Sequence, residues 1–288
     1  MPELPEVETT IRGLRKTAVG LTIKDVWTDL KTKDKRQRDA VANPKYFLLF
    51  KKEVLNKKIV SVERRAKNIL INLSGGKTIL IHLKMTGHLL FNNKDKFVHL
   101  LFTLSGRNYL AFSDIRKFGK ITLLDPEGKQ ASYGAGTKTN YFAHLGPEPL
   151  DKDFTWQKLK ERLSKKPQGK IKIVLMDQSL LSGIGNIYSD EILWQSLVNP
   201  ERKVKDIKDE GFKKIFESLQ SILKKSISLG GDSMSDYINL FGKKGKFQLC
   251  HNAYRRTGEK CGKKGCKGII LRKIINGRSA HFCSIHQK

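Results

Sequence analysis

The sequence predicts an α+β fold with a β-rich N-terminal part, a helical middle and a small basic tail with candidate metal ligands. Short alternating apolar runs separated by glycine-containing turns occupy about residues 21–125, a pattern typical of strands. Leu145-Gly146-Pro147-Glu148-Pro149 marks the expected domain boundary, and beyond it apolar residues recur with the period of a helix. All four Cys residues lie at or after position 250, where their clustering indicates metal ligation rather than disulfides.

The charge of the chain restricts the classes of partner. The 288 residues include 56 Lys and Arg against 28 Asp and Glu, a formal net charge of +28. A charge of this size indicates an anionic partner, either nucleic acid or an acidic membrane surface. The longest stretch without a charged residue, Gln178–Ser189, is too short for a membrane-spanning helix, which needs about 20 residues. Since the acidic, Pro-rich start is unlike a secretory signal, we expect a cytoplasmic protein.

Individual elements follow from the spacing of apolar residues. Val7, Ile11 and Leu14 predict a helix over about residues 3–18. Further helices are expected near 156–163 and 212–223, and one is expected to begin near Asn186 after the glycine-rich stretch 182–185. The expected strands, which we interpret as hairpins of a β-sandwich or barrel, are 68–73, 77–83, 100–104, 109–112 and 120–124.

The N-terminal stretch Pro2-Glu3-Leu4-Pro5-Glu6-Val7-Glu8 has two interpretations. Pro and acidic residues suit the first turn of a helix, so the stretch can be an ordinary helix start. If Met1 is removed, however, Pro2 exposes a secondary amine that can attack a sugar C1′ and give an iminium ion. The iminium is an electron sink that makes strand scission by elimination accessible, and Glu3 would serve as acid or base beside the sugar.

The basic tail carries a candidate metal site. Cys261-x4-Cys266 and Cys283-x2-His286 form two short pairs of soft ligands, which fit a tetrahedral structural zinc ion. Cys250 lies outside either pair and is expected to be buried as a small apolar side chain. His281 and His251 are the nitrogen ligands that compete with His286. His281 is the stronger competitor of the two, because it too flanks Cys283.

Pro2–Thr10, with the sequence PELPEVETT, resembles the N-terminus of the formamidopyrimidine-DNA glycosylase family, and further motifs agree in order along nearly the whole chain. The resemblance implies a catalytic β-sandwich domain with a long N-terminal helix over residues 1–143. A helix–two-turns–helix domain with a lesion-capping loop would follow over 144–242, and a β-hairpin zinc finger over 243–288. The implied activity is excision of 8-oxoguanine and formamidopyrimidines from duplex DNA, followed by β,δ-elimination at the abasic site.

The resemblance also implies catalytic roles. Pro2 would be the nucleophile, Glu3 the proton donor to the sugar, and Glu6 a second carboxylate that supports the site. Lys67, in Arg64-Arg65-Ala66-Lys67-Asn68, aligns with the lysine assigned as proton donor in β-elimination. Arg278, in Asn276–Phe282, aligns with the hairpin arginine assigned to δ-elimination.

DNA-binding roles are implied for six further residues. Extrusion of a base leaves a hole and an unpaired partner base, which an apolar wedge and a guanidinium can fill. Met85, Arg116 and Phe118 match the residues that do this in the family, while Lys172 and Asn186 align with residues that bind the DNA backbone. His99 corresponds to the second histidine of a family H-x-H motif whose first position is Phe97 here. Gly230–Tyr237 resembles the lesion-capping loop.

The chain departs from the family pattern in the zinc finger, and two alternatives to the glycosylase interpretation stay open. Family members usually carry four zinc-binding Cys in two C-x2-C pairs, whereas this chain has a wider first pair and a final His286. One alternative is an oxidised-pyrimidine glycosylase of the endonuclease VIII type, against which Leu4 and the residues Met85, Arg116 and Phe118 argue. The other is a non-catalytic binder of damaged DNA, which leaves Pro2 and Glu3 without a purpose. We expect a monomer with one zinc ion, acting on duplex DNA that contains oxidised bases or abasic sites.

Overall fold

The computed structural model describes residues 1–32, 34, 37–130 and 140–288. Backbone contacts divide the chain into two compact units. The first contains Met1–Ala143 and Gly230–Gly245, and the second contains His144–Leu229 and Lys246–Lys288. The three-domain division expected from the sequence stays a prediction. Among the described residues, no helix is long and apolar enough to cross a membrane.

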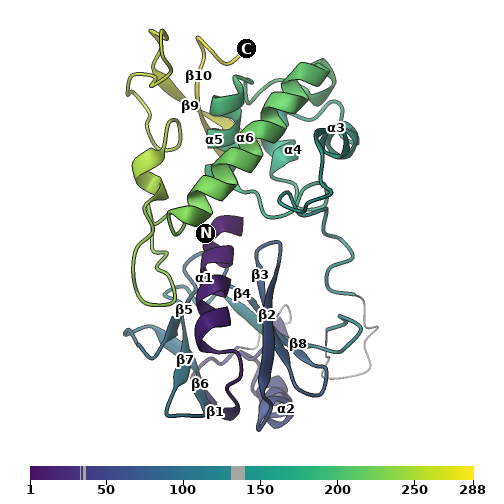
Figure 1. Ribbon diagram of the computed structural model, residues 1–288, viewed down its shortest axis with the longest axis vertical. Helices are drawn as coiled ribbons and strands as arrows, with labels where there is room; N and C mark the ends of the chain where they lie inside the picture. The colour runs from purple at the N-terminus through teal and green to yellow at the C-terminus, as the bar shows by residue number, and fades with distance from the viewer. Residues whose placement is uncertain (33, 35–36, 131–139) are drawn as a thin grey trace. The chain divides into compact units, whose positions relative to one another are not determined.

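Two antiparallel four-stranded sheets form the body of the first unit, as the sequence predicts (Figure 1). One sheet has the order β1-β6-β7-β5 and the other β2-β3-β4-β8. The strands are β1 (Ile23–Thr28), β2 (Ile59–Arg65), β3 (Asn68–Leu73), β4 (Thr78–His82), β5 (His88–Phe91), β6 (Val98–Leu104), β7 (Tyr109–Ser113) and β8 (Lys120–Leu124). The expected strands are all present, while β1, β2 and β5 were not anticipated.

Two α-helices lie among the described residues of this unit. Helix α1 spans Leu4–Thr17 and buries Val7, Ile11 and Leu14, the three residues whose spacing predicts it. Helix α2 (Pro44–Val54) lies in a region where the sequence analysis expected only strands. Its start is nevertheless marked, because the Asn43 side chain accepts hydrogen bonds from two backbone N–H groups and Pro44 occupies the first turn.

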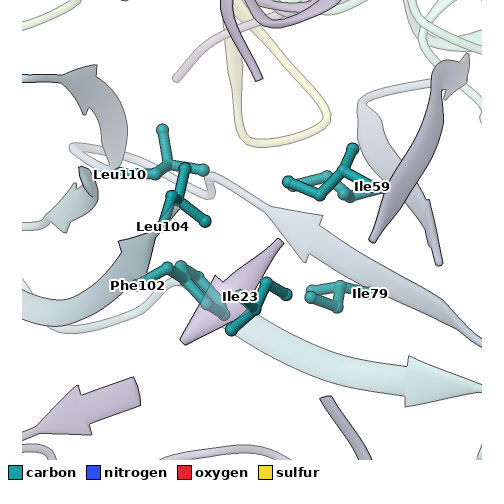
Figure 2. A pocket seen from close by; sticks show the side chains of 7 residues that line it. Ile23, Ile59, Ile79, Phe102, Leu104 and Leu110 are labelled. Atoms are coloured by element: carbon teal, nitrogen blue, oxygen red, sulfur yellow. The ribbon is translucent and has the colours of Figure 1, made fainter. Parts of the chain in front are cut away.

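The core of the first unit lies between the two sheets and beneath both helices. A small apolar gap remains in it, lined by residues from both sheets (Figure 2). Ile23 and Phe102 belong to one sheet, while Ile59 and Ile79 belong to the other. This packing fixes the strand ends from which the candidate functional loops emerge.

The second unit is helical and ends in a β-hairpin (Figure 1). The helices near 156–163 and 212–223 are confirmed as α3 and α6, and the helix beginning at Asn186 as α5. The hairpin strands contribute Ile270 and Cys283 to a small core that Trp194 of α5 completes. The elements are α3 (Trp156–Ser164), α4 (Ile171–Leu175), α5 (Asn186–Ser196), η2 (Val204–Asp206), α6 (Asp209–Ser228), η3 (Phe247–Cys250), β9 (Ile270–Ile275) and β10 (Arg278–Cys283).

Candidate functional site

Two buried carboxylates lie at the start of α1. Glu3 is the N-cap residue and Glu6 the third residue of the helix, and the two form a capping box in which Glu6 Oε2 accepts a 2.7 Å hydrogen bond from the Glu3 backbone N–H. Both are almost fully buried, with exposed fractions of 2% and 1%, and Pro2 is buried beside them. The ordinary interpretation of the motif as a helix start is therefore correct. The capping box also places two acids within four residues of the Pro2 nitrogen.

The predicted capping loop contacts the same carboxylate. Glu6 Oε1 accepts a 2.8 Å hydrogen bond from the Asp232 N–H, and the Tyr237 hydroxyl donates to the Glu6 carbonyl at 2.9 Å. Burial raises the pKa of the Tyr237 hydroxyl far above its usual value, so Tyr237 keeps its proton. Gly231 adopts φ +86°, and a Cβ there would lie 3.0 Å from Glu6 Oε1, which explains the glycine. Glu6 thus fixes both the helix start and the loop.

Lys67 lies in the turn between β2 and β3, and His82 lies in β4 of the same sheet. Lys67 follows Ala66, which adopts the left-handed conformation in the β2–β3 turn, and it is 6% exposed. His82 ends β4, and its Nδ1 accepts a 3.0 Å hydrogen bond from the Lys84 N–H, which requires that Nδ1 carry no proton. Burial, and then the charges of Lys84 and Lys67, lower the pKa of His82 to about 3. No sequence pattern assigns a role to this His.

The three predicted hole-filling side chains are exposed on two loops of the first unit. Met85 is 42% exposed and Phe118 is 50% exposed, while the guanidinium carbon of Arg116 lies 4.6 Å from the Phe118 ring centroid. His99, by contrast, is only 8% exposed, and its Nδ1 lies 2.9 Å from an Asp29 carboxylate oxygen.

The second unit contains a buried network at the start of α5. The Lys172 ammonium has no exposed surface and donates to the Asn186 carbonyl at 2.9 Å, to Ser189 Oγ at 2.8 Å and to Asp190 Oδ1 at 2.7 Å. Asp190 Oδ2 accepts two hydrogen bonds from His281 of β10, one from the backbone N–H at 3.1 Å and one involving Nδ1 at 2.8 Å. In this structure a phosphate cannot reach Lys172, because protein atoms enclose its ammonium.

The hairpin tip presents Arg278. Asn276 and Gly277 adopt φ of 46° and 75°, the conformation of a tight hairpin turn, and Arg278 follows as an exposed residue at the start of β10. Next to it, the Ser279 hydroxyl accepts a 3.0 Å hydrogen bond from the Asn186 side-chain amide. The Asn186 side chain and the hairpin tip therefore lie together at the N-terminal end of α5.

Glu191, the acidic residue beside Asp190, has a structural role. It is 1% exposed, and its two oxygens accept hydrogen bonds of 2.8–2.9 Å from the backbone N–H groups of Asn252, Ala253 and Tyr254. Three N–H donors converging on one carboxylate anchor the loop that precedes the cysteine cluster to α5.

The four predicted metal ligands come together. The donor atoms of Cys261, Cys266, Cys283 and His286 all lie within 4.8 Å of one another. His286 Nδ1 is 3.2 Å from Cys261 Sγ, and its Nε2 lies 3.3 Å from the Trp194 carbonyl, so Nδ1 is left to face a metal ion. Three thiols and one imidazole in this arrangement fit a structural zinc ion. His281, the competing ligand, is instead engaged with Asp190.

Comparisons with known proteins agree with the fold. The family described as "Formamidopyrimidine-DNA glycosylase N-terminal domain" matches residues 1–121, and "Formamidopyrimidine-DNA glycosylase H2TH domain" matches 145–237. The chain is 36% identical to the formamidopyrimidine-DNA glycosylase of Heliobacterium modesticaldum and 37% identical to that of Carboxydothermus hydrogenoformans, with all of each chain covered.

Solved structures show the same similarity. Wild-type Lactococcus lactis Fpg (MutM), solved with N7-benzyl-Fapy-dG DNA, superposes over all of both chains with a TM-score of 0.84 at 32% identity. The same bacterium's Fpg bound to DNA with an abasic site gives 0.83 at 32% identity, covering 99% of each chain. The Thermus thermophilus MutM protein gives 0.81 at 30% identity, covering 99% of this chain and 98% of that one.

The fold, the paired carboxylates at the N-terminus and the cysteine cluster define a DNA-repair glycosylase that also cleaves the strand as a lyase. The chain belongs to the formamidopyrimidine-DNA glycosylase family.

Proposed function

We propose that this enzyme excises oxidised purines, 8-oxoguanine and formamidopyrimidines, from duplex DNA through a covalent intermediate on Pro2. The observation that carries this proposal is the buried pair Glu3 and Glu6 next to the Pro2 nitrogen. Buried acids on a rigid helix start can exchange protons with a bound sugar without first reorganising solvent. Relatives solved with Fapy-dG and abasic-site DNA support this substrate class.

The reaction follows from the residue types. The Pro2 nitrogen forms a bond to C1′ while the bond from C1′ to the base breaks, and the base leaves with the bonding electrons and takes up the proton that the nitrogen gives up. Glu3 supplies a proton to the sugar ring oxygen as the ring opens. The resulting iminium acidifies the hydrogens on C2′, and loss of a C2′ proton expels the 3′ phosphate by β-elimination. The double bond formed in that step extends the acidity to C4′, and loss of the C4′ proton expels the 5′ phosphate by δ-elimination. Lys67 and Arg278 are the proposed proton donors in these two steps.

Met85, Arg116 and Phe118 are the proposed hole-filling residues. Their exposure and the stacking of Arg116 on Phe118 suit insertion into a duplex from which a base has been extruded. The Arg116 guanidinium offers donors to the orphaned base, while Met85 and Phe118 supply apolar surface to its neighbours. A contact from His99 would have to use Nε2, because Nδ1 faces Asp29.

Backbone binding in the second unit is proposed for Asn186, at the start of α5. The backbone N–H groups of a helix start and the positive end of the helix dipole favour a phosphate there. Because Lys172 is enclosed, its proposed role is to hold the Asn186 carbonyl and Asp190 in place rather than to touch DNA. A zinc ion on the Cys3His set would hold the hairpin that carries Arg278.

The remaining proposals concern organisation and setting. The three-domain division into residues 1–143, 144–242 and 243–288 follows the roles of the chemical site, the helical segment and the zinc finger. We infer that one copy of the chain acts on one lesion in double-stranded DNA. Because relatives of the chain come from bacteria, whose DNA lies in the cytoplasm, we place the enzyme there.

The nucleophile is tested by trapping with borohydride. Protein incubated with an 8-oxoguanine duplex and borohydride should form a covalent protein–DNA adduct, since reduction converts the iminium into a stable amine. Pro2→Gly should greatly weaken trapping, and Glu3→Gln should suppress base excision while leaving trapping on a preformed abasic site. Mass analysis must show that Met1 is absent from the trapped protein. If protein that retains Met1 is trapped as fully as protein without it, Pro2 is not the nucleophile.

A further inference from the structure

Two loops of the first unit carry the proposed hole-filling side chains. The loop between β4 and β5 carries Met85, and the loop between β7 and β8 carries Arg116 and Phe118. The two loops are separate in the sequence, and each of them connects a strand of one sheet to a strand of the other. If they moved independently, the three side chains would have to find their common position separately in each encounter with DNA.

A buried carboxylate joins the two loops. Asp114 has no exposed surface, and its Oδ1 accepts hydrogen bonds from the Thr86 hydroxyl and from the Arg116 N–H, the latter at 3.2 Å. Its other oxygen accepts from the Gly119 N–H at 2.7 Å. The Thr86 hydroxyl also receives the Arg116 N–H at 3.2 Å. Asp114 from one loop and Thr86 from the other therefore both accept a hydrogen bond from the Arg116 N–H. We call this arrangement the Asp114–Thr86 clasp.

Both loops also lie against one aromatic ring. A Cβ on Gly87 would lie 3.0 Å from the Phe112 ring and 2.4 Å from the Leu83 carbonyl oxygen. A Cβ on Gly119 would lie 2.3 Å from the same ring, closer than real side chains approach. Each loop thus has a glycine where it meets Phe112, which is 1% exposed, and neither loop can lift without exposing that ring.

The turns that present the wedge are similar in the two loops. Lys84 and Lys117 both have φ of 55°, the left-handed region, and each is followed directly by an apolar residue of the proposed wedge. Such conformations are unfavourable for lysine and persist only where the surroundings fix them. The clasp and the Phe112 ring supply that fixation on both sides.

We propose that Asp114 and Thr86 are positioning residues that hold Met85, Arg116 and Phe118 as one preformed wedge. This inference rests on the hole-filling role proposed above for those three side chains. A preformed wedge loses little conformational freedom when it enters the duplex, so the clasp lowers the cost of extruding the lesion. It also fixes the Arg116 backbone, which sets the donors that face the orphaned base. The clasp therefore contributes to lesion excision from duplexes and to discrimination of the opposite base, but not to bond cleavage.

The test uses the full-length zinc-loaded enzyme and Thr86→Val, which keeps the shape of the side chain but removes its hydroxyl. We expect the single-turnover excision rate on an 8-oxoguanine:C duplex to fall about tenfold, as loss of a hydrogen bond to a charged group implies. The preference for C over A opposite the lesion should narrow, and methyl NMR should show greater mobility of Met85. Thr86→Ser should restore all three. Thr103→Val, on the exposed face of β6, is the matched control.

Single-stranded DNA with an abasic site separates positioning from chemistry, because no base must be extruded and no partner base is left. Thr86→Val should cleave it at the wild-type rate. Equal losses on single-stranded and duplex substrates would overturn the clasp as a positioning device, and so would wild-type behaviour of Thr86→Val on duplexes. If Arg116→Ala and Phe118→Ala also behave as wild type, the hole-filling role itself fails. If those two variants lose excision activity on duplexes while Thr86→Val does not, the hole-filling role stands and only the positioning role of the clasp is refuted.

Discussion

The two units hold their functional side chains in physically different ways. In the first unit, a continuous apolar core from both sheets and both helices supports the start of α1 and the wedge loops. In the second, the end that carries Arg278 rests on a cysteine–histidine cluster, a buried ion pair and a carboxylate that binds three N–H groups. The apolar cluster there is small and is shared between Trp194 and the hairpin.

This contrast predicts that the two units respond differently to amino-acid substitutions. Apolar burial is spread over many contacts, so the loss of one polar group at its edge leaves the scaffold intact. A buried polar network is cooperative, and removing one member leaves its partners charged and unpaired in a poorly solvated place. Single substitutions should therefore be most damaging in the hairpin end of the second unit, and the following predictions test this.

Removal of zinc should have the largest effect. Chelation, or Cys283→Ser, should disorder the hairpin, because zinc binding to small domains supplies folding free energy directly, about 10–16 kcal/mol in zinc-finger peptides. A disordered hairpin no longer presents Arg278 to DNA, and a hydrogen bond to a charged group is worth about 1.5–3 kcal/mol, so duplex affinity should fall about tenfold or more. Metal analysis, circular dichroism and DNA titration check this.

Cys250→Ser is the matched control, since Cys250 lies outside the cluster. It should keep one zinc per chain and normal binding, and the β-sheet signal of the first unit should survive chelation. If zinc is lost from Cys250→Ser and kept in His286→Ala, the ligand assignment is wrong. If chelation unfolds both units, the fold of the first unit depends on the zinc site of the second, contrary to our prediction.

The next largest effect is expected for Lys172→Met. Both members of the Lys172–Asp190 pair have no exposed side-chain surface, so the variant leaves a buried carboxylate that only His281 partly compensates. Breaking such a pair costs about 3–5 kcal/mol. Denaturant unfolding followed by tryptophan fluorescence measures it, because two of the three Trp residues, Trp156 and Trp194, belong to the second unit.

Lys170→Met provides the comparison for this variant. Lys170 pairs with Glu201 at 2.9 Å, with side chains 39% and 28% exposed, and such surface pairs are worth about 0–1 kcal/mol. Adding Asp190→Asn to Lys172→Met should recover part of the lost stability. Equal losses in the two single variants would mean that burial of Lys172 carries no special penalty.

Sequence patterns predicted the central strands well and most edge strands poorly. The expected ranges 68–73 and 109–112 fall on β3 and β7, which are paired on both sides, and the helix expected over 3–18 is α1. The missed strands β1, β2 and β5 all lie at sheet edges. Edge strands carry charged and polar residues on their exposed side, as in Ile23–Thr28, so their alternation is weaker. Helix α2 was missed although Asn43-Pro44 marks its start.

Site residues divide according to whether their partners are local. Cys261, Cys266, Cys283 and His286 form two short pairs, so spacing alone predicts them. The enclosure of Lys172 depends on Asp190, and that of Asp190 on His281 from the hairpin, which no local pattern reveals. A signal did exist, because Asp190 and Glu191 lie directly before the apolar run Ile192-Leu193-Trp194, and buried acids must be partnered.

A smaller effect should appear when the pH is lowered to about 5, this time in the first unit. His82 has a pKa of about 3 in the folded protein and about 6.5 when unfolded, so between these values the unfolded state binds the extra proton. Stability from this group is fully present above pH 6.5 and falls by up to about 1.4 kcal/mol per pH unit below it. Imidazole NMR should show His82 neutral at about pH 5. His82→Gln should reduce the pH dependence of unfolding, whereas His144→Gln, at an exposed position, should not.

The smallest predicted effect compares one hairpin turn from each unit. A Cβ on Gly277 (φ +75°) would have no neighbouring atom within 4 Å, and one on Gly75 (φ +87°), between β3 and β4, would meet only the end of the Lys57 side chain. Alanine at either position therefore adds backbone strain without a clash, about 1 kcal/mol if the turn is rigid. Gly75→Ala should cost this amount, since β3 is paired on both sides and holds its turn in place.

Gly277→Ala shows whether the polar supports of the second unit hold its tip as firmly. An equal cost, measured by denaturant unfolding, means that the network behind Ser279 and His281 keeps the Arg278 turn rigid. A cost near zero means that the turn escapes the strain by changing conformation, because a mobile tip carries no fixed penalty. In that case Arg278 is positioned only when DNA binds, and the contrast between the two units extends from stability to dynamics.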